Sequence, residues 1–144
     1  MRTVVLLALL GAVSACGGLA TIHYDTKPAL DCLQRTNSTF AHRNARSIFV
    51  LFASEDGMSA VEPVFVSFGP ATVTGAVPAA LGATSKQPTW RERRGDARVS
   101  GYGPYEPPVA IRRHVPDRLA KAAVRKLGAD VRVAIDNCLK QNER

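Results

Sequence analysis

Apolar residues gather in short runs along the chain, and the strongest run predicts a β-strand. Residues 47–54 are rich in β-branched and aromatic side chains and are apolar on both faces, which is typical of an internal strand. Asp56-Gly57 is a turn signal, and the apolar pattern resumes at residues 64–68 after Pro63. We therefore expect two antiparallel strands here. Weaker runs at residues 71–74, 98–102 and 109–113 are candidates for further strands.

A first helix is predicted near the start of the folded part. It runs from Thr26 to about Gln34, with Thr26 as its N-cap and Pro28 in its first turn. The polar residues 35–46 predict a loop, and residues 77–108, rich in Gly, Pro and Arg, predict a much longer one. Loops longer than about 12–15 residues inside a compact domain are usually functional or mobile.

Helical spacing returns near the end of the chain. A helix opening at residues 116–117 would place Leu119, Ala123 and Leu127 on one face and end at Gly128. Residues 130–141 fit both a second helix and an alternating strand, and we favour the helix. The pattern as a whole predicts an α+β fold, in which a small antiparallel sheet of about three to five strands packs with an N-terminal helix and one or two C-terminal helices.

Composition and the first residues predict one domain and its location in the cell. The chain has 144 residues, 46% hydrophobic and 22% charged, which indicates one globular domain. A basic start at Arg2, an apolar run over residues 3–10 and the small residues that follow are typical of an export signal. The run is shorter than the ~20 apolar residues that cross a bilayer.

The end of this segment, Val13-Ser14-Ala15-Cys16, resembles the lipobox of bacterial lipoprotein precursors. The resemblance covers residues 1–16 alone, and implies a diacylglycerol on the Cys16 sulfur, cleavage before Cys16 and often a further acyl chain on the new amino terminus. Gly17 is not the Asp that signals inner-membrane retention, so the periplasmic face of the outer membrane is favoured. The resulting organisation is a signal peptide at 1–15, a lipidated tether at 16–25 and a globular domain at 26–144.

The cysteine count supports lipidation over ordinary secretion, the alternative that the residues before Cys16 also allow. Three cysteines would leave an odd thiol in an oxidising compartment. If Cys16 carries lipid, Cys32 and Cys138 remain and can form one disulfide between the two ends of the domain. Two unpaired buried thiols are the alternative.

The net charge of +7 is concentrated in the second half of the chain. Because Arg pairs with phosphates and carboxylates and Trp settles at headgroup interfaces, one basic segment is a candidate contact for an anionic partner. The candidate residues are Trp90, Arg91, Arg93, Arg94, Arg98, Arg112 and Arg113. A merely solvated loop, partly neutralised by Glu92 and Asp96, is the alternative. Export makes nucleic acid a poor candidate partner.

Catalytic and metal-binding motifs are not found in the sequence. His23, His42 and His114 lie far apart, and no nucleophile elbow, paired-histidine motif or phosphate-binding loop occurs. We therefore predict no enzyme activity, no metal and no cofactor. The expected role is an accessory binding component of an envelope assembly, anchored by its lipid and contacting another envelope protein or an anionic envelope component.

Two alternatives to that role stay open. The first is an inhibitor or immunity lipoprotein that inserts residues 102–108 or 90–98 into the active site of an enzyme. The second is a small enzyme whose active site, with His114 as a candidate residue, is assembled from residues distant in the sequence.

Overall fold

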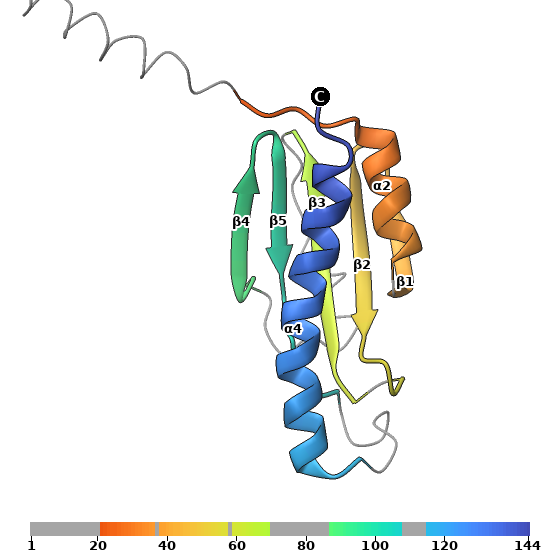
Figure 1. Ribbon diagram of the computed structural model, residues 1–144, viewed down its shortest axis with the longest axis vertical. Coiled ribbons are helices and arrows are strands. Elements are labelled where there is room, and N and C mark those ends of the chain that lie inside the picture. Colours follow the sequence, from red (N-terminus) through yellow and green to blue (C-terminus); the bar gives the residue numbers. More distant parts are fainter. Residues whose placement is uncertain (1–20, 37, 58, 70–86, 108–114) are drawn as a thin grey trace, which may run out of the picture.

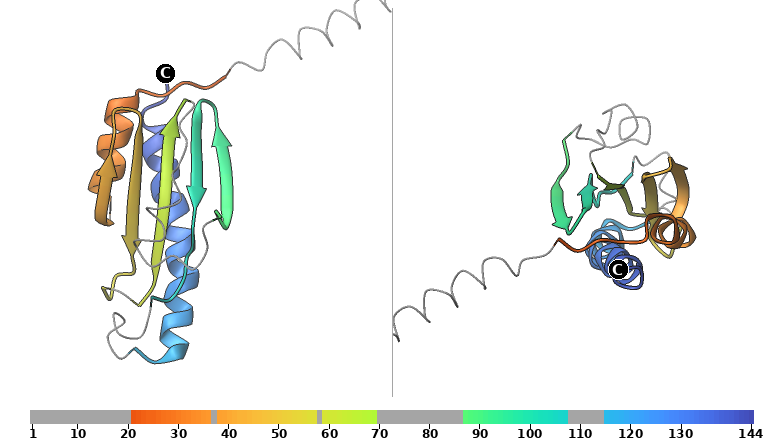
Figure 2. Two further views of the ribbon diagram at one scale, coloured as in Figure 1. Left: turned by 180° about the vertical axis from the view of Figure 1, so that it is seen from behind. Right: turned by 90° about the horizontal axis from the view of Figure 1, so that it is seen from above.

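The computed structural model describes residues 21–36, 38–57, 59–69, 87–107 and 115–144 (Figure 1). These residues form five strands and two helices. In chain order they are α2 (Thr26–Arg35), β1 (Ser38–Arg43), β2 (Ser47–Ala53), β3 (Val61–Phe68), β4 (Trp90–Arg94), β5 (Ala97–Gly101) and α4 (Asp117–Lys140). The strands make one antiparallel sheet in the order β1-β2-β3-β5-β4. Both helices cover the same face of the sheet (Figure 2), so the predicted α+β class is confirmed.

The core lies between that face and the two helices. Ile48, Val50 and Phe52 alternate along β2 toward the helices, while Leu51 and Ala53 belong to a smaller apolar cluster with Val61. All seven residues of β2 are buried, because the strand has neighbours on both edges and apolar contacts on both faces. The prediction of an internal strand is therefore confirmed.

Two expectations about strands are wrong in detail. The predicted loop at residues 35–46 contains β1, an edge strand whose polar residues are held by pairing with β2 rather than by an apolar pattern of their own. β3 begins at Val61 and includes Pro63, whose carbonyl accepts a hydrogen bond from the Tyr102 amide at 2.9 Å. The candidate strands at residues 71–74 and 109–113 lie outside the described residues.

The long loop predicted at residues 77–108 contains a β-hairpin, β4–β5, in the part that the structure describes. The candidate strand at residues 98–102 is confirmed as β5. Gly95 in the turn has a φ of +54°, which favours glycine, and a Cβ there would lie 2.0 Å from the carbonyl oxygen of Ile22. The basic segment is therefore built on paired strands rather than on a free loop.

The C-terminal helix is continuous, so its predicted end at Gly128 is wrong. Tertiary packing outweighs the ~1 kcal/mol that a glycine costs inside a helix: a Cβ at Gly128 would lie 3.1 Å from the Pro104 ring. The helix predicted at residues 130–141 is its second half. Leu127 is buried as expected, but Leu119 is 51% exposed, because Ala120 occupies the buried position instead.

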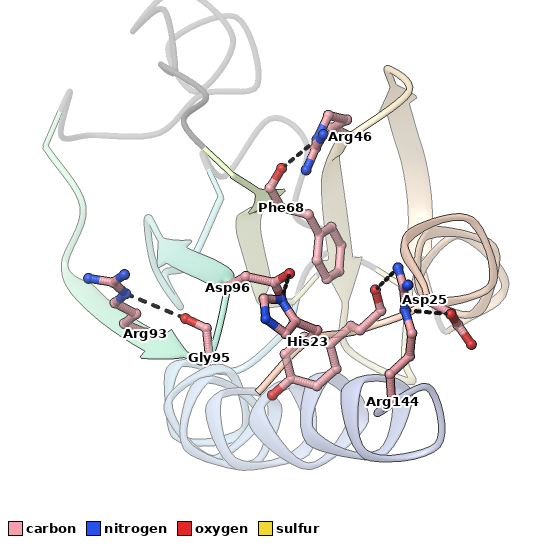
Figure 3. A network of polar contacts seen from close by, with 9 residues as sticks. His23, Asp25, Arg46, Phe68, Arg93, Gly95, Asp96 and Arg144 are labelled. Atoms are coloured by element: carbon pink, nitrogen blue, oxygen red, sulfur yellow. Dashed lines mark hydrogen bonds and ion pairs between the residues drawn. The ribbon is translucent and has the colours of Figure 1, made fainter. Parts of the chain in front are cut away.

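Residues 22–25, expected to belong to the tether, pack across one end of the domain (Figure 3). Tyr24 is 3% exposed and its ring meets Phe68 edge-on at 6.1 Å. The Ile22 carbonyl accepts a hydrogen bond from the Asp96 amide at 2.9 Å, and the Asp25 amide donates one to Asn142 at 2.8 Å. Asp25, rather than Thr26, is the N-cap of α2.

A disulfide joins Cys32 of α2 to Cys138 of α4, with the two Cα atoms 5.6 Å apart, as predicted. It links residues 106 positions apart in the sequence. The helices thus hold opposite ends of the chain together on one face of the sheet.

Replacing both cysteines, Cys32→Ala with Cys138→Ala, is expected to lower the free energy of unfolding by about 3–5 kcal/mol, since the bond restricts a long loop in the unfolded chain. Urea unfolding followed by circular dichroism measures the loss. Reductant should destabilise the parent protein and leave the double variant unchanged. Equal sensitivity of both proteins to reductant would contradict the role given to this bond.

Candidate functional site

The pleat of the β4–β5 hairpin divides the predicted basic segment into two sets. Arg91, Arg93 and Arg98 are exposed, whereas Trp90 and Arg94 face α4, where they contact Arg132 and Asp136. Arg112 and Arg113 lie outside the described residues. Three of the seven candidate contacts therefore form one exposed set, called here the arginine face.

Like charges meet directly on the arginine face. Arg93 of β4 lies opposite Arg98 of β5 in the strand register, and Arg91 lies opposite Ser100. Like charges directly opposite each other destabilise a sheet. Among the described residues, no ion pair joins these three arginines to a carboxylate. A bound anion would relieve the repulsion, which makes this face a candidate anion-binding surface.

Trp90 is engaged inside the protein. Its indole Nε1 donates a hydrogen bond to Oε1 of Glu62 at 2.6 Å, and the Arg132 guanidinium lies 4.7 Å from the ring centroid. Its partner in the register is Gly101, where a Cβ would lie 2.0 Å from the indole, so the ring fits because that residue has no side chain. Trp90 thus supports the edge of the sheet, and its N–H group is not available to a headgroup.

Glu62, the acceptor of that hydrogen bond, is fully buried in β3. Burial raises its pKa to about 7, although the Trp90 hydrogen bond, the charge of Arg132 and the Gly103 amide oppose the rise. A raised carboxyl pKa is common in active sites. Here, however, the carboxyl group is enclosed with no exposed surface, which denies a substrate access to it. We therefore assign Glu62 a structural role, as the buried acceptor of the Trp90 hydrogen bond.

Ion pairs extend this cluster along the interface between β4 and α4. Arg132 lies 3.5 Å from Glu92, Glu92 lies 3.3 Å from Arg94, and Arg94 lies 2.6 Å from Asp136. The charged residues of this side of β4 are thus paired with one another and with the helix. Arg94 is committed to this network, which explains why the sequence overstated the number of free arginines.

An apolar pocket lies between α4 and the end of β2, and sequence reasoning missed it. Its volume is about 270 Å³. The lining residues are Phe52, Ala53, Ser54, Glu55, Asp56, Ala123, Lys126, Leu127, Asp130, Val131 and Ala134. They come from two segments far apart in the sequence that only the sheet brings together. Leu119 and Val133 are 51% and 58% exposed, and exposed apolar side chains of this size can indicate a binding surface. Their exposure could be recognised only once the course of the helix was known.

The segment proposed for insertion into an enzyme is tied to the domain. Tyr102 is 4% exposed and packs against Phe49, with ring centroids 6.4 Å apart. Tyr105 exchanges two backbone hydrogen bonds of 3.0 Å with Val61. The described part of residues 102–108 is therefore held against the sheet, which argues against the inhibitor alternative in that form.

The structure also locates two of the three histidines. His23 lies 3.2 Å from Asp96, and His42 lies on β1; His114 is outside the described residues. In the described ranges no three His, Cys, Asp or Glu side chains are grouped as metal ligands. No helix within those ranges has the length and apolar character needed to cross a membrane.

Comparisons of the chain with protein-family models, with curated proteins and with solved structures find no match. The site must therefore be interpreted from its own geometry.

Glu62→Gln should remove a pH dependence of stability. Because the folded protein binds this proton more tightly than the unfolded chain does, Glu62 favours folding below about pH 4.5, and this contribution is lost as the pH rises to about 7. Gln keeps an acceptor for Trp90. Unfolding at pH 5 and pH 8 should show the variant gaining up to ~3 kcal/mol relative to the parent at the higher pH.

Glu55→Gln, at an exposed carboxylate, gives the baseline for removing one charge. If the free-energy difference between the Glu62→Gln variant and the parent is the same at both pH values, the buried carboxyl group does not titrate as described.

Proposed function

We propose that this chain is a lipid-anchored envelope protein, acylated at Cys16, whose domain binds an anionic component of the envelope without catalysing a reaction. The lipobox resemblance of residues 13–16 supports the anchor. The arginine face supports the anionic partner, since three exposed guanidinium groups lie together with no carboxylate paired to them among the described residues. The enclosure of Glu62 argues against using it as a catalytic acid.

The observation that carries the proposal is the hydrogen bond between the Ile22 carbonyl and the Asp96 amide, 2.9 Å long, at the tip of the β4–β5 hairpin. Ile22 lies only six positions after Cys16, and six residues span at most about 20 Å. A lipid on Cys16 would therefore keep the hairpin tip near the bilayer surface. Arg93 is close to this tip (Figure 3), and Arg98 is its partner across the strands.

Lipid and basic charge would then act together. A single acyl chain gives marginal membrane binding, and a basic patch near an anionic surface adds about 1 kcal/mol per Lys or Arg. The ligand chemistry is a phosphate, borne by a phospholipid or by lipopolysaccharide. In this proposal the arginine face orients the anchored domain on its own membrane, and the rest of the surface is left for protein partners.

The anchor is tested by the Cys16→Ser variant. We expect the parent protein to fractionate with membranes and to carry acyl groups on Cys16 by intact mass spectrometry. The variant should lack that mass and should fail to be processed by the lipoprotein route. A parent chain recovered unmodified from the soluble fraction would exclude lipidation.

The arginine face is tested with the full chain carrying Cys16→Ser, so that no lipid contributes. Vesicles of phosphatidylcholine with about 30% phosphatidylglycerol should sediment this protein, whereas pure phosphatidylcholine should not. Replacing Arg91, Arg93 and Arg98 by Gln should reduce binding about 100-fold, at about 1 kcal/mol for each charge.

The matched control replaces three exposed basic residues of α4, Arg118, Lys121 and Arg125, by Gln. Equal losses in the two triple variants would mean that net charge, and not this face, drives binding. Soluble lipopolysaccharide added as a competitor distinguishes the two phosphate sources.

A further inference from the structure

The first half of α4 lacks a helical neighbour among the described residues. α2 has 10 residues and α4 has 24, which correspond to lengths of about 15 and 36 Å. The disulfide joins α2 to Cys138, near the C-terminal end of α4. As Figure 1 shows, α2 therefore runs beside only the end of α4 that carries the C-terminus. The apolar pocket lies beyond the end of α2.

One flank of α4 beside this pocket carries two exposed large apolar side chains, Leu119 and Val133. Leu119, Ala123, Lys126, Asp130 and Val133 are spaced by three or four residues, so they form one stripe on the helix. Leu119 and Val133 are two of four large hydrophobic side chains that are exposed in the described ranges. Ala123, Lys126 and Asp130 also line the pocket. Stripe and pocket are therefore one continuous surface, called here the α4 groove.

The rim of the α4 groove is acidic, although the chain carries a net charge of +7. Glu55, Asp56 and Asp130 lie at the pocket with Lys126 as the one basic residue of its lining. Lys126 pairs with Glu55 at 3.1 Å. Asp56 accepts hydrogen bonds from the hydroxyls of Ser54 and Ser59. A ligand that complements this surface carries apolar groups for the pocket and positive charge for the rim.

We propose that the α4 groove binds an amphipathic helix of a partner protein, with an apolar face seated in the pocket and basic residues facing Asp130 and Glu55. The groove is the place that α2 would cover if it were longer, so a helix packed there would complete a layer already present. Recognition of an amphipathic helix in an apolar groove is a common mode of binding. A second copy of this chain is a poorer fit, because symmetric pairing would bring two acidic rims together.

The proposal goes beyond the proposed function and does not depend on lipid at Cys16. It is tested on the full chain with Cys16→Ser. The probe is a labelled synthetic peptide of about eighteen residues, or ~27 Å of helix, with Leu at helical spacing and Lys on both flanks. A matched peptide carries Glu in place of Lys. Fluorescence anisotropy should show the basic peptide binding at least about tenfold more tightly, a difference of ~1.4 kcal/mol.

Variants of the groove locate the binding. Val133→Arg, at an exposed residue, and Ala123→Arg, inside the pocket, should each weaken binding of the basic peptide about tenfold or more, and Asp130→Lys should weaken it about fivefold. Phe40→Arg, at an exposed apolar residue of β1 outside the groove, is the matched control and should keep most of the affinity. Circular dichroism verifies that each variant is folded, and Val133→Arg keeps the test decisive if Ala123→Arg does not fold.

Four results would overturn the proposal. The first three are failure of the basic peptide to bind, equal binding of the basic and acidic peptides, and binding that Val133→Arg leaves unchanged. A fourth is a dimer in light scattering that Val133→Arg dissociates, because the occupant would then be a second copy. Vesicle binding by the arginine face is measured separately, so its failure is distinguishable from failure of the groove.

Discussion

The closure of the chain by its two end segments is the constraint on which the other features depend. Cys32 of α2 is bonded to Cys138 of α4, and the residues before α2 run alongside those after α4, with Tyr24 paired to Glu143. This closure fixes the end of the sheet at which the chain enters. It also fixes how far along α4 the short helix α2 can reach. The entry point, and a groove that α2 does not cover, are therefore two consequences of one arrangement.

The edge of the sheet is held by a different means, a chain of polar contacts under β4. Trp90 links the buried Glu62 to Arg132, and Arg132 continues through Glu92 to Arg94. The side chains of these ion pairs are partly exposed, and such pairs usually contribute little to stability. What the network does here is to define which face of the hairpin turns toward α4. The opposite face is consequently left with Arg91, Arg93 and Arg98.

The sequence was informative where burial alone decides the structure. β2 is apolar on both faces and α2 has a clear helical pattern, so both could be predicted, and the odd number of cysteines pointed to the pair Cys32–Cys138. The sequence was misleading where the structure of a segment depends on a partner far along the chain. β1 is polar and exists by pairing with β2, β4 carries charges that α4 neutralises, and Gly128 stays helical against Pro104. The pocket could not be predicted for the same reason, since its walls come from β2 and α4.

The two proposed binding surfaces occupy different places on the domain, an arrangement that would let it link two partners. The arginine face belongs to the hairpin whose tip holds Ile22, next to the chain's entry into the domain. The pocket is formed by residues at the end of β2 and by the middle of α4, from Ala123 to Ala134. A domain held to a membrane by its first residues would thus keep its basic face toward anionic headgroups and its acidic groove away from them. Opposite charges at opposite ends would also keep the two proposed ligands from competing, because a basic helix is repelled by a face that attracts phosphate.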